Sequence, residues 1–233
     1  VVAGAAEANV AETIRACEGA LETETRPDAR AELLHLRAVA EQAGGDLDKA
    51  VGFAKKALEE DPGLAKGWNT LAILQHRAGR TLEAIEAAQT AIRLDPNMME
   101  AHLTFASLYR SRRRPRRAAD GYRRALQLDP GSVQALSGLA GALTEAGDAE
   151  GAIRAYESLQ RLRPEDPSVA GSLAATLLYA GRGEAAARQA DRVLERDPEN
   201  LTALKIRLEN GPLEGAEKAE IAARKMGKKN AKL

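Results

Sequence analysis

Residues 65–98 read AKGWNTLAILQHRAGRTLEAIEAAQTAIRLDPNM. In the first half of this stretch, Trp68, Leu71 and Ala72 follow the i, i+3, i+4 spacing of one stripe on an α-helix. Gln75, at i+7, is a polar exception on the same stripe. The spacing predicts an amphipathic helix with one apolar face.

Two residues divide the stretch into helical segments. Gly79 can adopt the left-handed conformation that ends a helix, and Pro96 cannot continue one. We therefore expect a first helix (helix A) over about 66–78 and a second (helix B) over about 82–94.

The same pattern recurs along the chain with a period of 34 residues. It is marked by Pro62, Pro96, Pro130, Pro164 and Pro198. An alanine lies 12 residues before each proline, at Ala50, Ala84, Ala118, Ala152 and Ala186. A glycine lies 17 residues before four of them, at Gly45, Gly79, Gly147 and Gly181. One helix pair cannot bury its apolar face alone, so neighbouring pairs must stack.

This pattern resembles the tetratricopeptide repeat (TPR) family. Residues 65–98 match the family pattern at Trp68, Leu71, Ala72, Gly79, Ala84, Ala91 and Pro96. Residues 99–132 match it at Phe105, Ala106, Tyr109, Ala118, Tyr122, Ala125 and Pro130. The sequence departs from the pattern at Gln75, where the family has Tyr, and at Arg113, which replaces the turn glycine.

The resemblance implies an all-α fold, an α-α superhelical solenoid of helix pairs in a single array. We expect residues 1–27 to form a partial N-terminal repeat or capping helix. Residues 28–200 are expected to form five repeats with boundaries near 64, 98, 132 and 166. Residues 201–233 are expected to form divergent capping helices and a basic tail.

The first repeat has irregular spacing, because Pro27 lies 35 residues before Pro62. The adjacent Gly44 and Gly45 are the natural place for the extra residue. A shift of one residue puts three apolar residues on the packing stripe: Leu33, Leu36 and Ala40.

Composition excludes several classes of function. The chain has 34 basic and 34 acidic residues, so no net field draws it to nucleic acid or to an anionic membrane. No apolar run reaches the roughly 18 residues of a membrane span. The single cysteine, Cys17, cannot form an internal disulfide.

The sequence has no recognisable catalytic motif, and His35, His76 and His102 lack the spacing of metal ligands. We therefore expect no metal site, no cofactor and no enzymatic activity.

In the resembled family the A helices line a concave groove that holds a peptide or a partner helix. Helix-face arithmetic selects the A-helix residues that avoid the packing stripe. The candidate groove residues are Lys66, Asn69, Thr70, Ile73, His76, Arg77, Leu103, Ser107, Arg110, Gln134, Ser137, Gly141, Glu145, Gly171 and Tyr179. Among them, Gly141 and Gly171 could clear room for a ligand backbone or reflect drift on a tolerant face.

Some family members clamp a C-terminal carboxylate with Lys and Asn. The matching positions here are Leu34, Ala38, Thr70, Glu100 and Thr104, so we expect no binding of chaperone tails.

The strongest local anomaly is a run of arginines in the predicted A–B turn of the third repeat. It comprises Arg112, Arg113, Arg114, Arg116 and Arg117. These side chains could bind an acidic or phosphorylated partner; the alternative is a solvated turn without a ligand. Nucleic acid is disfavoured, because stacking aromatics are not interleaved with the arginines.

The leading hypothesis is a scaffold that binds a protein or peptide in its groove. The alternatives are a non-catalytic region of a larger enzyme, such as a transferase, and a self-assembling TPR oligomer. The chain starts without Met, so we expect a fragment or a processed product, in the cytoplasm or else in the periplasm. The Ala- and Arg-rich composition is typical of a high-GC bacterium.

Overall fold

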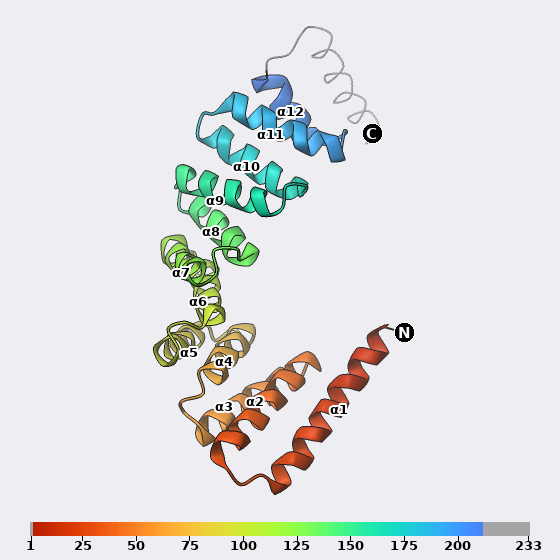
Figure 1. Ribbon diagram of the computed structural model, residues 1–233, viewed down its shortest axis with the longest axis vertical. Helices are drawn as coiled ribbons and strands as arrows, with labels where there is room; N and C mark the ends of the chain where they lie inside the picture. Colours follow the sequence, from red (N-terminus) through yellow and green to blue (C-terminus); the bar gives the residue numbers. More distant parts are fainter. Residues whose placement is uncertain (1, 212–233) are drawn as a thin grey trace. The chain divides into compact units, whose positions relative to one another are not determined.

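The structure, a computed structural model, describes residues 2–211, with side chains from residue 9 onward. Over this range the chain forms twelve α-helices and no strand (Figure 1). The prediction of an all-α fold built from helix pairs is confirmed.

The helices alternate along the chain in pairs. The A helices are α2 (Pro27–Ala43), α4 (Ala65–Arg77), α6 (Met99–Ser111), α8 (Val133–Glu145) and α10 (Pro167–Tyr179). Their B partners are α3 (Leu47–Glu60), α5 (Thr81–Leu94), α7 (Pro115–Leu128), α9 (Ala149–Leu162) and α11 (Gly183–Arg196). The helix α1 (Val2–Thr23) precedes the first pair, and α12 (Leu201–Asn210) follows the last.

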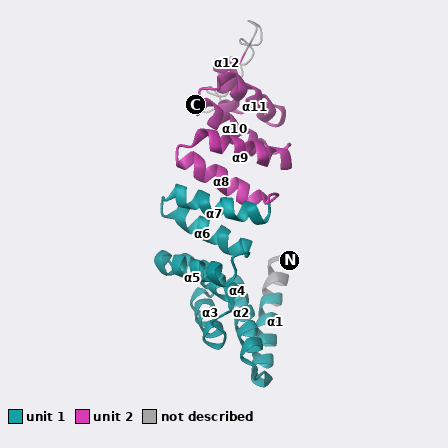
Figure 2. Cartoon of the chain, turned by 60° about the vertical axis from the view of Figure 1, so that its left-hand side comes forward, with its two compact units in different colours: residues 1–129 teal, residues 130–233 magenta. Residues whose placement is uncertain are grey.

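The chain divides into two compact units (Figure 2). Unit 1 spans Val1–Asp129 and contains α1 to α7; unit 2 spans Pro130–Leu233 and contains α8 to α12.

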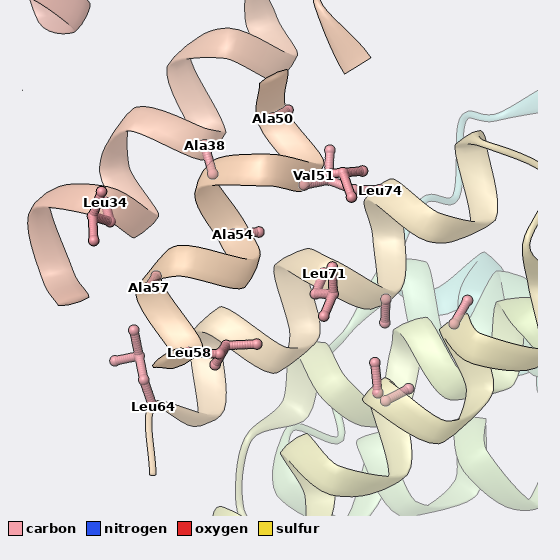
Figure 3. Packing of buried hydrophobic residues seen from close by; sticks show 14 of the residues in the cluster. Leu34, Ala38, Ala50, Val51, Ala54, Ala57, Leu58, Leu64, Leu71 and Leu74 are labelled. Carbon is pink, nitrogen blue, oxygen red and sulfur yellow. The ribbon is translucent and has the colours of Figure 1, made fainter. Parts of the chain in front are cut away.

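One buried apolar cluster of unit 1 runs continuously from α2 to α6. Ala38, Ala54 and Ala72 are completely buried, and their small side chains allow helices to pack closely. Figure 3 shows Ala38 directed toward α3, and Leu58 and Leu71 in the region where α3 faces α4. Each pair therefore buries its apolar face against both its partner helix and the next pair.

The core of unit 2 repeats this arrangement with different residues. Leu173 and Ala174 of α10 pack with Ala190 of α11, and Ile206 of α12 joins the same cluster. The helix α12 thus covers the apolar side of the last pair.

Each A–B turn needs one residue in the left-handed region. Gly79 has a φ of 78°, and its turn closes through the hydrogen bond from the Arg80 N–H to the Gln75 carbonyl, 2.8 Å long. In the third pair Arg113 occupies the same position with a φ of 55°. The bond from the Arg114 N–H to the Tyr109 carbonyl closes this turn at 2.9 Å. The turn therefore keeps its geometry without glycine.

The predicted register of α2 is wrong. Leu36 is 47% exposed and Leu33 is only half-buried, although Ala40 is buried as expected. The buried stripe instead contains Leu34 and Ala38, in phase with the later repeats without any shift. The error came from treating two unlike prolines as equivalent.

The two prolines have different places in the fold. Pro27 is the first residue of α2, whereas Pro62 lies in the loop between α3 and α4. The unshifted register puts Arg37 where Leu71 lies in the next repeat. Its guanidinium lies 4.0 Å from the ring centre of Phe53 and pairs with Glu18 of α1 at 2.6 Å.

The ends of the chain also differ from the expected repeats. The helix α1 is continuous from Val2, so no separate helix A precedes it within residues 2–23. The helix α12 ends at Asn210, next to Gly211. The capping helix and basic tail expected after that point lie outside the described residues.

Replacing Arg113 with glycine should raise the free energy of unfolding by about 1 kcal/mol, because glycine adopts a positive φ without steric cost. Urea unfolding measures the change. Gly79→Ala is the matched control at the equivalent turn and should lower stability by about the same amount. Equal stability of Arg113→Gly and the wild type would contradict the strain at this turn.

Two helical glycines should respond oppositely to alanine. A Cβ at Gly121 would lie 2.9 Å from the Ala106 Cβ, whereas one at Gly171 would meet only the Val193 Cγ2, at 3.9 Å. Gly121→Ala should therefore cost about 1–3 kcal/mol through overpacking. Gly171→Ala should add about 0.5–1 kcal/mol through helix propensity. Thermal unfolding of both variants tests the pair, and a stabilising Gly121→Ala would refute the close α6–α7 contact.

Candidate functional site

The A helices of unit 1 lie against one another, since α4 contacts both α2 and α6. Polar side chains link α2 to α4. The Lys66 Nζ lies 2.5 Å from a Glu32 carboxylate oxygen, and the His35 Nε2 lies 2.9 Å from the Thr70 Oγ1. This A-helix face is therefore held by polar contacts as well as by apolar packing.

The structure separates the candidate groove residues of unit 1 into three groups. Four are exposed: Lys66, Arg77, Ser107 and Arg110. Two are half-buried: Ile73 and His76. Three are buried: Asn69, Thr70 and Leu103.

The buried group corrects the prediction that all these side chains are open to a ligand. Thr70 faces α2, because it is hydrogen-bonded to His35. The side chains of Asn69 and Leu103 are also covered, since each residue has a relative exposed area of only 7%. Helix-face arithmetic treats one helix in isolation, so it misses the cover that a neighbouring helix provides.

His35 is the titratable group most affected by this face. Burial lowers the pKa of its imidazole below the ordinary value of 6.5, and the Lys66 ammonium acts in the same direction. Glu32 opposes the shift. The neutral imidazole is therefore favoured at the contact with Thr70.

Unit 2 contains a pocket of about 510 Å³ among α8, α9 and α10. Its walls come from the C-terminal end of α8, the turn into α9, α9 itself and α10. The lining residues are Thr144, Glu145, Gly147, Ala149, Tyr156, Ser172, Ala175, Thr176 and Tyr179. Two predicted groove residues, Glu145 and Tyr179, thus come together at one site.

Tyr179 is an exposed aromatic residue of this pocket, with a relative exposure of 77%. Two threonines also line the pocket, and the hydroxyl of each is already hydrogen-bonded to a carbonyl of its own helix. The Thr144 Oγ1 donates to the Ala140 carbonyl at 2.9 Å, and the Thr176 Oγ1 donates to the Ser172 carbonyl at 2.8 Å. With these donors satisfied, the pocket suits an apolar or aromatic group.

The remaining candidates of unit 2 lie outside this pocket. Gln134 and Ser137 are exposed on α8, and Gly141 and Gly171 are half-buried. Gly171 is not required for close helix packing, because a Cβ there has room.

Sequence reasoning missed Tyr156, which lines the pocket from the B helix α9. Helix-face arithmetic on the A helices does not reach a residue of α9. The signal available was its repeat position, since Tyr156 lies 34 residues after Tyr122.

A second hollow, of about 880 Å³, lies in unit 1 among α5, α6 and α7. Phe105 and Gly121 line it together with Glu86, Arg93 and Arg124. Its walls carry both signs of charge, so no single ligand class is selected by charge.

His102, also at this hollow, has a structural role. Its Nε2 lies 2.9 Å from the Pro96 carbonyl. One repeat earlier, the Trp68 Nε1 donates to the Pro62 carbonyl at 2.8 Å. A carbonyl can only accept, so His102 donates through Nε2 and replaces the indole of Trp68.

All five arginines of the predicted anionic-partner patch are exposed. They are Arg112, Arg113, Arg114, Arg116 and Arg117. Among the residues that the structure describes, none of their side chains takes part in an ion pair or hydrogen bond. Within the described residues, no acidic side chain is therefore paired with the patch.

The described residues exclude two features, a metal cluster and a membrane span. No cluster of three or more His, Cys, Asp or Glu side chains in the described part could hold a metal ion. No helix between residues 2 and 211 is both long and apolar enough to cross a bilayer.

Two family models match the chain. One, described as the cytochrome c-type biogenesis protein H TPR domain, matches residues 50–170. The other, described as a tetratricopeptide repeat, matches residues 143–208. No curated protein sequence matches the chain.

Several solved structures share the fold. YrrB, titled a TPR protein with an unusual peptide-binding site, superposes with a TM-score of 0.71 at 20% identity, covering 82% of this chain and 97% of its own. MamA gives a TM-score of 0.65 at 23% identity, covering 70% and 95%. PilF of Pseudomonas aeruginosa gives 0.68 at 19% identity, covering 87% and 90%.

The depressed pKa of His35 predicts a pH dependence of stability. The unfolded state binds a proton near pH 6.5, whereas folded His35 resists protonation. Its stabilising contribution is therefore complete above about pH 6.5 and declines as the pH falls toward the folded pKa. Urea unfolding at about pH 7.5 and about pH 5.5 should show a smaller loss for His35→Gln than for the wild type. An identical loss in both proteins would exclude His35 as the source.

Proposed function

Because a TPR family model spans more than half of its length, this chain belongs to the tetratricopeptide repeat family, and we propose that it is a protein-interaction scaffold. It binds a segment of a partner protein on the faces of its A helices. The segment is extended or helical and contributes at least one apolar side chain.

The pocket of unit 2 carries the proposal. It combines a volume of about 510 Å³, large enough for several side-chain atoms, with an aromatic ring at its edge. Tyr179 remains 77% exposed without a ligand, although burial of its ring in a complex would be favourable. An exposed tyrosine beside a hollow is typical of an interface anchor.

The chemistry of the walls indicates which side chain enters. Ala149 and Ala175 are small, and the hydroxyls of Thr144 and Thr176 are bonded to their own helices. A Leu, Met or Phe side chain of the partner would therefore leave both threonine hydroxyls paired. The Tyr179 hydroxyl can bond to the backbone of the bound segment.

The scaffold also suits binding on energetic grounds. Its helices are ordered by their own cores, so little conformational entropy is lost when a peptide docks. The YrrB title names a peptide-binding site in a protein with this fold, which is consistent with the proposal.

Filling the pocket should weaken binding. Peptides selected from a displayed random library on the wild-type protein supply the ligands, and fluorescence anisotropy measures their affinity. Ala175→Trp should weaken selected peptides by at least about tenfold, and Tyr179→Ala by about three- to tenfold. Both positions are exposed, so Tm should stay within about 1–2 °C of the wild type.

Ala16→Trp is the matched control, since Ala16 is an exposed alanine on α1, far from the pocket in the sequence. It should leave affinity unchanged. Selected peptides that bind Ala175→Trp as well as the wild type would reject the pocket as the binding site.

A further inference from the structure

The turn between α6 and α7 combines three unfavourable features, two of which occur at no other A–B turn of the described chain. First, it places Arg113 at a φ of 55°, where the remaining turns of the described chain use glycine. A non-glycine residue in this conformation is strained, and an arginine offers no local hydrogen bond that would offset the strain.

Second, the helix that follows has no side-chain cap. The carboxylates of Asp46 and Asp148 accept the N–H groups of α3 and α9 at the equivalent position. At α7 that position is Arg114, whose side chain caps nothing, as is also true of Arg80 at α5 and Arg182 at α11. The first N–H groups of α7 are left without this acceptor.

Third, the first turn of α7 carries the wrong charge for its own helix. The other B helices have an acidic residue there: Asp48, Glu83, Glu150 and Glu184. The helix α7 has none and carries Arg116 and Arg117 instead. Positive charge at a helix N-terminus opposes the helix dipole.

These five arginines therefore weaken the turn and find no partner within the described chain. We propose that Arg112, Arg113, Arg114, Arg116 and Arg117 form a docking surface for an acidic segment of a partner protein. Carboxylates of that segment pair with the guanidinium groups, often in bidentate fashion, and compensate the charge at the start of α7. This surface is separate from the pocket of unit 2 and does not depend on it.

The distribution of charge within unit 1 favours an acidic protein segment over a nucleic acid or a membrane. Because the helix pairs repeat the same up-and-down order, their A–B turns lie on one edge of the unit. The α2–α3 turn on that edge carries Asp46 and Asp48, and the α4–α5 turn carries both Arg80 and Glu83. A phosphate backbone or a lipid plane would extend over these acidic turns, whereas a short acidic segment contacts one turn only.

The test compares one clustered and one dispersed change of charge in the full chain. Arg112→Glu, Arg114→Glu and Arg117→Glu reverse the cluster. Arg154→Glu, Arg188→Glu and Lys205→Glu reverse the same amount of charge at exposed sites on three helices of unit 2. The probe is a labelled peptide that alternates glutamate with alanine, measured by anisotropy at about 0.01 M and about 0.15 M ionic strength.

The clustered variant should bind the peptide at least about tenfold more weakly than the wild type at low ionic strength, and the dispersed variant less than about threefold more weakly. The clustered variant should also unfold at the same or a higher temperature, because glutamate suits the start of α7. Unchanged peptide affinity in the clustered variant would overturn the proposal, as would an equal loss in both variants.

Two further probes distinguish the other polyanions. Single-stranded oligothymidylate and vesicles containing phosphatidylserine are titrated under the same conditions. Weaker binding of both than of the acidic peptide is expected. Tighter binding of either one, lost in the clustered variant, would assign the surface to that ligand and reject the acidic protein segment.

Discussion

The structure depends on close approach of helices through alanine. Completely buried alanines, such as Ala54, Ala72 and Ala88 in unit 1, allow backbones to pack with little side-chain bulk between them. Larger apolar residues, including Leu58 and Leu71, then fill the space where one pair meets the next. Each pair depends on its neighbours to bury this surface, so the repeating helix order and the short turns follow from one packing rule.

Much of the fold could be predicted because the repeat reports the same information several times. The A helix expected over about 66–78 lies at Ala65–Arg77, and the B helix expected over about 82–94 lies at Thr81–Leu94. The predicted register of α2 was wrong, because the regular repetition ends at this helix. Pro27 follows only a partial repeat, and sequence spacing alone did not reveal that it starts a helix, unlike Pro62.

The candidate site was less predictable, because it depends on contacts between repeats. Tyr179 and Glu145 were found by helix-face arithmetic, and they do meet in one pocket. Thr70 was assigned to the same kind of surface, but its bond to His35 turns it toward α2. The hydrogen bond of His102 to the Pro96 carbonyl was also hidden, since nothing in the repeat pattern equates an imidazole with the indole of Trp68.

The order of contacts has a consequence for how the chain acquires its structure. Within each unit, helices pack mainly against those adjacent in sequence, and the A–A contacts of unit 1 span only one intervening helix. Short loops close at little entropic cost, so a nucleus can form at any well-packed pair and grow by adding its neighbours. Such local topology is associated with fast folding. The first nucleus should form where helix propensity and core are strongest, and the strained α6–α7 turn should join late.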